Sequence, residues 1–329
     1  MDLDPKKPEP GLYRDVPWDV YRAIDAANHS TLKRLDRAPA HLRYDLDHPK
    51  EPTEAMIRGS AVDAALLEPD TFLERFACQP SDEDIACADN GCDDYADASY
   101  RELQAIAGEM GIKANGKTDE LRARVSGMAL WLEANKEKQL IKLETWVLIQ
   151  ELVDAVQNGP NQTARDLLFE SEGINQATLV WRDIETDLLC KGRPDRIIRE
   201  YDGCPTTADF KTSVKPATEH RRGGYLMDYW CHTQAAMYRS GLNTIAGSDA
   251  LYRRPVIVMV EAAPNSHHGV VCLAIDEDTM DQGDRQYRRW LNQYAECVAN
   301  DHWPSYPDGL TRVSIPRWGF DPGVELHGI

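Results

Sequence analysis

The stretch from residue 177 to residue 212 constrains the fold most, because three strand-like segments follow one another in it. Branched and aromatic residues, which strands favour, recur in these segments. Their sequences are ATLVWRDI (177–184), LLCKGRPDRIIREY (188–201) and TTADFKT (206–212). Segments this close in sequence pair as neighbouring strands, so the region predicts the centre of a sheet. Two further strand-like segments follow at 254–262 and 269–276.

Helical segments precede and interrupt this sheet. Residues 53–68 have a face of small apolar side chains that predicts a packed helix, and residues 127–171 read as further helices. Residues 226–242 predict a helix that ends at Gly241, and a last helix is expected over residues 281–298. Helices first, and then a sheet with a helix inserted before its later strands, indicate a mixed α/β core.

Composition narrows the class of protein. The 329 residues are 42% hydrophobic, enough for one large α/β unit with an insertion. The 37 basic and 55 acidic residues give a net charge of −18, which argues against a protein that coats nucleic acid non-specifically. It allows a local basic channel and fits a metal-dependent enzyme.

The eight cysteines contain no C-x-x-C pair, and the N-terminal segment is polar and rich in proline. We therefore expect reduced thiols, a cytoplasmic protein and no membrane contact. Cys87 and Cys92 leave a metal or iron–sulfur site open as a minor alternative, although their spacing matches no familiar pattern.

Two acidic residues and a lysine stand where strands should fill a core. Alternation along a strand puts Asp209 and Lys211 on one side and Ala208 and Phe210 on the other, towards the core. Asp195 ends the preceding strand, where a hairpin would bring it beside Asp209. Two carboxylates repel unless a cation lies between them, and oxygen ligands suit Mg²⁺ or Mn²⁺. A surface hairpin with an Asp–Lys ion pair is the alternative.

These residues resemble a known signature. Pro194-Asp195 followed by Asp209-Phe210-Lys211 resembles the motif of PD-(D/E)XK nucleases. Further segments resemble the RecE-type (exonuclease VIII) branch, over about residues 12–76 and 140–318. They are Gly59-Ser60-Ala61, Leu66-Leu67-Glu68-Pro69, Lys191 to Asp195, Gln234-Ala235-Ala236-Met237-Tyr238, and the tail Trp303-Pro304, Tyr306 and Ile315-Pro316-Arg317-Trp318.

The resemblance implies a fold, an activity and partners. The fold is a PD-(D/E)XK nuclease core, a mixed central sheet flanked by helices. The activity is a Mg²⁺-dependent exodeoxyribonuclease, with Mn²⁺ able to substitute, that degrades double-stranded DNA from 5′ to 3′ and leaves 3′ tails for recombination. The implied partners are double-stranded DNA ends, further copies in a ring-like homo-oligomer and a RecT-like single-strand annealing protein. The implied setting is the cytoplasm of a bacterium or a phage-infected host.

The resemblance also implies roles for residues. Asp195 and Asp209 would bind metal, and Lys211 would assist the attacking water. Gln234 and Tyr238 match a Q-x-x-x-Y helix motif, and their i, i+4 spacing puts both on one helix face, towards the metal or the DNA end.

One position departs from the family pattern. RecE-type proteins carry a histidine ligand four residues after the motif glycine, and this chain has Asp63 there. Aspartate also binds Mg²⁺, so we expect Asp63 to be a metal ligand, with a plain helix residue as the alternative. Glu68 reads as a helix-end residue rather than a ligand.

Basic residues near these positions predict contacts with DNA phosphates. They are Lys33 and Arg34 on the first helix, Arg193 before Asp195, Arg221 and Arg222 after the catalytic strand, and Lys117. An acidic exterior around a basic passage follows from the net charge.

Four segments organise the chain. We expect residues 1–76 to form the N-terminal helical part of the core, 77–98 an acidic linker, 99–127 a helical insertion, and 128–329 the remainder of the core. The insertion resembles a SAP-like helix–extended–helix module through Glu102-Leu103, Gly111-Ile112, Gly116-Lys117-Thr118 and Glu120-Leu121. A helical spacer without DNA affinity is its alternative.

Two other functions stay open on the sequence alone. One is a structure-specific or Cas4-like nuclease, although the cysteines are not arranged for the iron–sulfur cluster of the latter. The other is a non-catalytic DNA-binding protein that keeps the nuclease fold, against which the intact Asp195, Asp209 and Lys211 argue.

Overall fold

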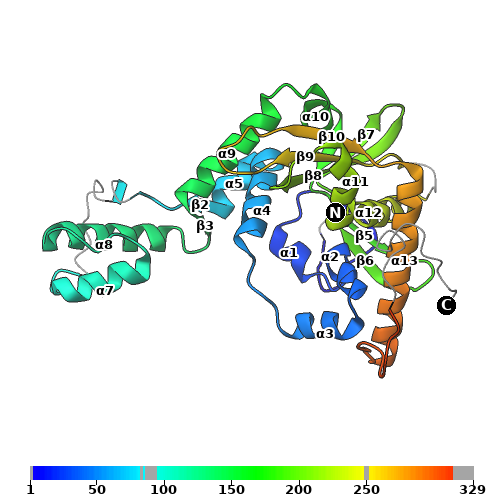
Figure 1. Ribbon diagram of the computed structural model, residues 1–329, viewed down its shortest axis with the longest axis horizontal. Helices are drawn as coiled ribbons and strands as arrows, with labels where there is room; N and C mark the ends of the chain where they lie inside the picture. Colours follow the sequence, from blue (N-terminus) through cyan, green and yellow to red (C-terminus); the bar gives the residue numbers. More distant parts are fainter. Residues whose placement is uncertain (1–2, 82–83, 86–94, 248–251, 314–329) are drawn as a thin grey trace, which may run out of the picture.

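A computed structural model describes residues 3–81, 84–85, 95–247 and 252–313 (Figure 1). Cys87, Cys92 and Ile315 to Trp318 lie outside these residues. The strands are β1 (Gly11–Tyr13), β2 (Phe76–Cys78), β3 (Gln139–Ile141), β4 (Gly173–Asn175), β5 (Thr178–Arg182), β6 (Leu189–Gly192), β7 (Arg196–Tyr201), β8 (Cys204–Ser213), β9 (Val256–Glu261) and β10 (Val270–Ala274).

Helices precede, interrupt and follow the strands. They are α1 (Trp18–Ala23), α2 (His29–Leu32), α3 (Pro39–Asp47), α4 (Glu54–Leu67), α5 (Pro69–Arg75), α7 (Tyr100–Met110), α8 (Thr118–Ala134), α9 (Leu143–Gln157), α10 (Gln162–Arg165), α11 (Arg222–Asp228), α12 (Cys231–Ala246) and α13 (Glu277–Asn300). Shorter turns are η1 (Lys33–Asp36), η2 (Asp166–Glu170) and η3 (Glu219–Arg221). None of the helices in the described ranges has the length and apolar composition to cross a membrane.

The central sheet has the strand order β10-β9-β8-β7-β4. β8 and β9 run parallel, and the other neighbours are antiparallel. Asp202 and Gly203 turn the chain between β7 and β8, and both have positive φ, as a tight two-residue hairpin loop requires. A second sheet has the order β1-β5-β6, and β2 pairs with β3.

Helices cover both faces of the central sheet. Ala208 and Phe210 of β8 are buried on one face with residues of α4 and α9. On the other face, Ile257 and Met259 of β9 pack against α12, which also contacts Trp181 of the second sheet. The predicted mixed α/β core is therefore confirmed.

We expected the segment 188–201 to form one strand, but it forms two. β6 pairs with β5 in the second sheet, and β7 pairs with β8 in the central sheet. Arg193, Pro194 and Asp195 lie between them, because Pro194 has no N–H to donate to a ladder. The break leaves Asp195 at the point where the chain passes from one sheet to the other.

The segment 226–242 is not one helix either. α11 and α12 meet at Trp230, whose φ of +58° lies in the left-handed region. Gly241 does not end the helix but lies inside α12, where an added Cβ would come within 2.8 Å of the Trp181 ring. Gly247, with φ of +72°, is the residue that ends α12. The last helix, Glu277–Asn300, is longer than the predicted 281–298.

Replacing Gly283 by alanine should destabilise the packing of α13 on α12. The added Cβ would lie 2.5 Å from the backbone oxygen of His232, which cannot move as a side chain tip can. We expect a loss of about 1–3 kcal/mol in the free energy of unfolding, measured by urea denaturation.

Gly108 of α7 provides the matched control, since a Cβ there meets nothing within 4 Å. Gly108→Ala should leave stability unchanged or raise it by up to about 1 kcal/mol, because alanine favours helix. Equal losses in the two variants would contradict this account of Gly283.

The helices α7 and α8 form a lobe that extends away from the sheets (Figure 1). Ser99 caps α7 through a capping box, and Gly111, with φ of +70°, ends it. The lobe has its own small core of Leu103, Ala107, Leu121 and Val125. β2 and β3 flank it in the chain and pair with each other. We expected the insertion to end at residue 127 and helices to follow, but α8 continues to Ala134 and β3 comes next. The domain boundaries and the SAP-like assignment stay predictions.

Candidate active site

The turn into β7 and strand β8 bring three predicted site residues together. Arg196 of β7 pairs with Ala208 of β8, so Asp195 lies next to Asp209. Asp195 Oδ2 accepts a hydrogen bond from the backbone N–H of Phe210 at 2.7 Å, across the two strands. Both carboxyls are more than nine-tenths buried, with exposed fractions of 8% for Asp195 and 6% for Asp209.

Lys211 lies on the same side of β8 as Asp209. Its Nζ donates to Asp209 Oδ2 and, at 3.2 Å, to the backbone oxygen of Phe210. The other carboxylate oxygen, Asp209 Oδ1, is buried and has no hydrogen-bond partner in the described part of the chain. A buried anionic oxygen without a partner is costly, so it marks a place for a positive ligand.

Asp63 of α4 completes an acidic cluster, which we define as Asp63, Asp195 and Asp209. Burial raises the pKa of Asp63 to about 7, with the charge of Asp209 adding to the effect and that of Lys211 opposing it. Burial, and then the charges of Asp209 and Asp63, raise the pKa of Asp195 well above its usual range. The three groups therefore resist being charged together without a cation.

The same cluster keeps the Lys211 side chain positively charged. Burial lowers the pKa of the ammonium, but the charges of Asp209 and Asp195 outweigh it and raise the pKa well above the usual value. Lys211 is consequently protonated at neutral pH.

The acidic cluster fits a divalent cation in chemistry but not yet in arrangement. Carboxylate oxygens are the ligands that Mg²⁺ and Mn²⁺ prefer, and Asp209 Oδ1 is free to bind. Within the described residues, however, no three acidic, histidine or cysteine side chains are already arranged to hold a metal. Lys211 occupies Asp209 Oδ2 instead, so a cation at this oxygen would displace it.

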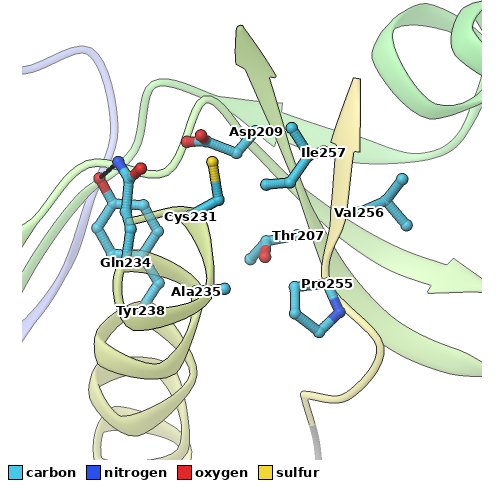
Figure 2. A pocket seen from close by; sticks show the side chains of 9 residues that line it. All are labelled: Thr207, Asp209, Cys231, Gln234, Ala235, Tyr238, Pro255, Val256 and Ile257. Atoms are coloured by element: carbon cyan, nitrogen blue, oxygen red, sulfur yellow. Dashed lines mark hydrogen bonds between the residues drawn. The ribbon is translucent and has the colours of Figure 1, made fainter. Parts of the chain in front are cut away.

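Helix α12 presents Gln234 and Tyr238 to the same place. Gln234 Nε2 donates to Tyr238 Oη at 2.9 Å, and Tyr238 Oη donates to the backbone oxygen of Arg193 at 3.2 Å. Figure 2 shows both side chains on one side of Asp209, in a recess that Cys231 also lines. Gly192 is required here, because a Cβ would lie 2.9 Å from the Tyr238 ring.

Comparison with known proteins agrees with this geometry. Residues 28–311 match the PDDEXK-like domain of unknown function (DUF3799). The chain belongs to this family. The predicted membership of the PD-(D/E)XK superfamily is thereby confirmed, whereas the RecE-type branch stays a prediction.

Solved structures and curated sequences add little to the PDDEXK-like assignment. A candidate exonuclease from Eubacterium rectale is 10% identical, with 91% of this chain and 94% of that chain covered and a TM-score of 0.49. The structure of SSO0001 is 13% identical, with 82% of this chain and 93% of that chain covered and a TM-score of 0.24. Both likenesses are too distant to support a statement on activity. No curated protein matches the chain.

The basic residues predicted to contact DNA differ in how exposed they are and in where they lie. Lys33 is half-buried, and its pKa is lowered by burial and by the nearby charge of Lys211. Arg34, Arg221 and Arg222 are exposed, and Lys117 lies in the α7–α8 lobe, where it precedes α8.

Arg193 differs from the other predicted contacts because it is buried. Its guanidinium donates to Thr178 Oγ1 at 2.8 Å and to the backbone oxygen of Val16 at 2.7 Å. A direct phosphate contact would require Arg193 to leave both partners, so this placement does not favour the predicted DNA contact.

Two residues near the PDDEXK-like site were not predicted. Gln176 Nε2 donates to Asp195 Oδ1 at 3.2 Å, and burial raises the pKa of the Cys231 thiol to about 12. No local pattern marks either residue, since both reach the site through the packing of distant segments. Glu68 follows α4 and pairs with Arg75 at 2.7 Å, in keeping with a helix-end position.

Proposed function

We propose that the chain is a divalent-metal-dependent nuclease that hydrolyses DNA phosphodiester bonds, as an exonuclease of the RecE type. One observation carries the proposal. In a PDDEXK-like domain, the buried carboxyls of Asp195 and Asp209 lie side by side, Asp209 Oδ1 has no partner in the described residues, and the charges of Asp63 and Lys211 act on the same place.

Asp195, Asp209 and Asp63 would hold Mg²⁺, or Mn²⁺ in its place. A divalent cation bound there would lower the pKa of a bound water and polarise a phosphoryl oxygen. In the metal-free site the charges of Asp209 and Asp195 outweigh burial and raise the pKa of Lys211, so the side chain carries a positive charge there. We infer that it stabilises the negative charge that develops on the phosphate during hydrolysis.

Tyr238 positions the acidic cluster rather than reacting. Burial, and the charges of Asp209 and others, raise the pKa of its phenol well above the usual value, so it remains a neutral donor. Its hydrogen bond to the Arg193 backbone holds the segment that carries Asp195. Gln234 fixes the direction of the phenol hydroxyl.

The neighbourhood of Lys33 supports an anionic substrate. Lys33 and Lys211 are close enough for each charge to disfavour the other, and a phosphate between them would remove that cost. A chain with a net charge of −18 needs such local basic groups to hold DNA at all.

The direction of degradation and the partners rest on the motif resemblance. The segments around Gly59, Lys191 and Gln234 support 5′ to 3′ degradation of duplex ends, with 3′ single-stranded tails as product. The same resemblance supports a ring-like homo-oligomer and a RecT-like annealing partner, in the cytoplasm of a bacterium or a phage-infected host.

End-labelled linear duplex tests the direction of degradation. With Mg²⁺, we expect early release of a 5′ label and late release of a 3′ label, followed on a denaturing gel. A nicked or closed circle of the same sequence should stay intact. Cleavage of the closed circle, or early loss of the 3′ label, would show an endonuclease or the opposite polarity instead.

A further inference from the structure

Helix α1 presents an aromatic pair with an arginine beside it. The rings of Trp18 and Tyr21 are stacked, with centroids 5.2 Å apart and 23° between their planes. The Arg193 guanidinium lies 5.2 Å from the Trp18 centroid and 4.5 Å from the Tyr21 centroid. Trp18 remains 47% exposed, so much of its ring surface faces solvent.

Two buried cations hold this helix in place. Lys191 Nζ donates to the backbone oxygens of Tyr21 at 3.0 Å and Ile24 at 2.6 Å, and Arg193 donates to Val16 just before α1. A six-residue helix is unstable alone, and burying two cations is costly.

The aromatic pair lies close to the acidic cluster. Arg193 is two residues before Asp195, and two residues of extended chain span at most about 7 Å. The backbone oxygen of Arg193 is also the group that Tyr238 of the site contacts. Tyr21, the partner of Trp18, also lies near enough to Tyr238 for its charge to raise the pKa of that phenol. A DNA strand whose phosphate occupies the acidic cluster can therefore run along the Arg193 segment towards Trp18.

We propose that Trp18, supported by Tyr21 and Arg193, is a stacking platform for an unpaired nucleobase beside the acidic cluster. This inference rests on the proposed nuclease function and adds a substrate preference. Every base has a flat face that stacks on tryptophan, whereas bases inside a duplex are already stacked on one another. The platform therefore favours frayed or single-stranded DNA at the site, without regard to sequence.

Binding of labelled single-stranded oligonucleotides in EDTA tests the platform apart from cleavage. Trp18→Ala should weaken binding of a base-containing oligonucleotide by roughly 5- to 100-fold. It should weaken binding of an abasic oligonucleotide of the same length much less, and Trp18→Phe should retain most of the affinity. Fluorescence anisotropy provides the dissociation constants.

Tyr44→Ala is the matched control, because Tyr44 is an exposed aromatic residue on α3 that stacks on His48. It should leave both affinities unchanged. Equal weakening of both oligonucleotides by Trp18→Ala, or none, would overturn the platform, as would a changed oligomeric state that assigns Trp18 to a protein contact. A wild-type protein that binds bases through Trp18 yet cleaves no DNA would refute the nuclease proposal alone.

Discussion

Replacing Asp209 by asparagine should lower phosphodiester cleavage by about a thousandfold or more and leave the fold intact. A loss of that size corresponds to about 4 kcal/mol of transition-state stabilisation. The amide removes the negative charge of one proposed metal ligand and of the group that pairs with Lys211. Lys211 keeps the charges of Asp195 and Asp63 nearby, so it is not left without counter-ions. Cleavage of labelled duplex and a thermal melt provide the two readouts.

Asp183 is the matched control, since it is also a buried aspartate, 3% exposed, but belongs to a structural ion pair. Both its carboxylate oxygens lie 2.8 Å from Arg288 Nη1, which reaches them from α13. Asp183→Asn should lower stability by about 1–3 kcal/mol, because it leaves partly buried Arg288 with only Glu185, 3.6 Å away, as an acidic partner, and should leave cleavage unchanged. Cleavage that survives in Asp209→Asn, or is lost equally in both variants, would remove Asp209 from the mechanism.

Local patterns in the sequence were enough for the geometry of β8. Alternation along one strand requires no knowledge of distant contacts, and Ala208 and Phe210 are indeed buried in the core opposite Asp209. The mixed core likewise followed from the order of helical and strand-like segments. These features are local, so the sequence alone determines them.

Breaks within elements depended on packing between distant segments. Gly241 was expected to end a helix, because glycine is frequent at helix ends. It lies inside α12 instead, because the ring of Trp181 in another sheet leaves no room for a side chain. Gly192 is constrained in the same way by Tyr238. Neither neighbour is near in sequence, so the propensity of glycine gave the wrong reason for Gly241.

Some residues of the site follow from a local motif, and others depend on contacts between distant segments. The motif indicated Asp195, Asp209 and Lys211, and the resemblance added Asp63 with Gln234 and Tyr238. The environment of Arg193 was not predictable, because the ring stack of α1 and Thr178 engage it from separate parts of the chain. A basic residue next to a predicted metal-binding aspartate suggests a DNA contact, whereas here its guanidinium lies beside the rings of Trp18 and Tyr21.

The metal-free protein should lose stability relative to its Asp63→Asn variant as the pH rises. The pKa of Asp63 is about 7 in the folded protein and about 3.9 when unfolded, so the folded state binds more protons between these values. Stability therefore falls with rising pH by up to about 1.4 kcal/mol per pH unit for this group. The variants should be equally stable near pH 4 and differ by a few kcal/mol at pH 8.

The comparison must be a difference between variants, because other groups titrate in the same window. Burial lowers the pKa of His29 to about 3, so the folded state binds fewer protons there and stability rises with pH up to about 6.5. This opposing effect is the same in both variants and cancels. Asp183→Asn should show no such pH dependence above about pH 4, because hydrogen bonds and Arg288 lower the pKa of Asp183 despite its burial, and its contribution to stability is lost only at lower pH.

Divalent metal should remove the cost that Asp63 imposes. At pH 8, Mn²⁺ at a hundred times its dissociation constant should raise the stability of the wild-type protein by about 2.7 kcal/mol. Asp63→Asn should gain less, because it lacks one of the three carboxylates, and at pH 5 the gain should shrink as Asp63 and Asp195 take up protons. Urea denaturation at each pH, with Mn²⁺ or EDTA, measures these gains. Equal stabilisation of both proteins at both pH values would place the metal elsewhere and remove Asp63 from the ligand set.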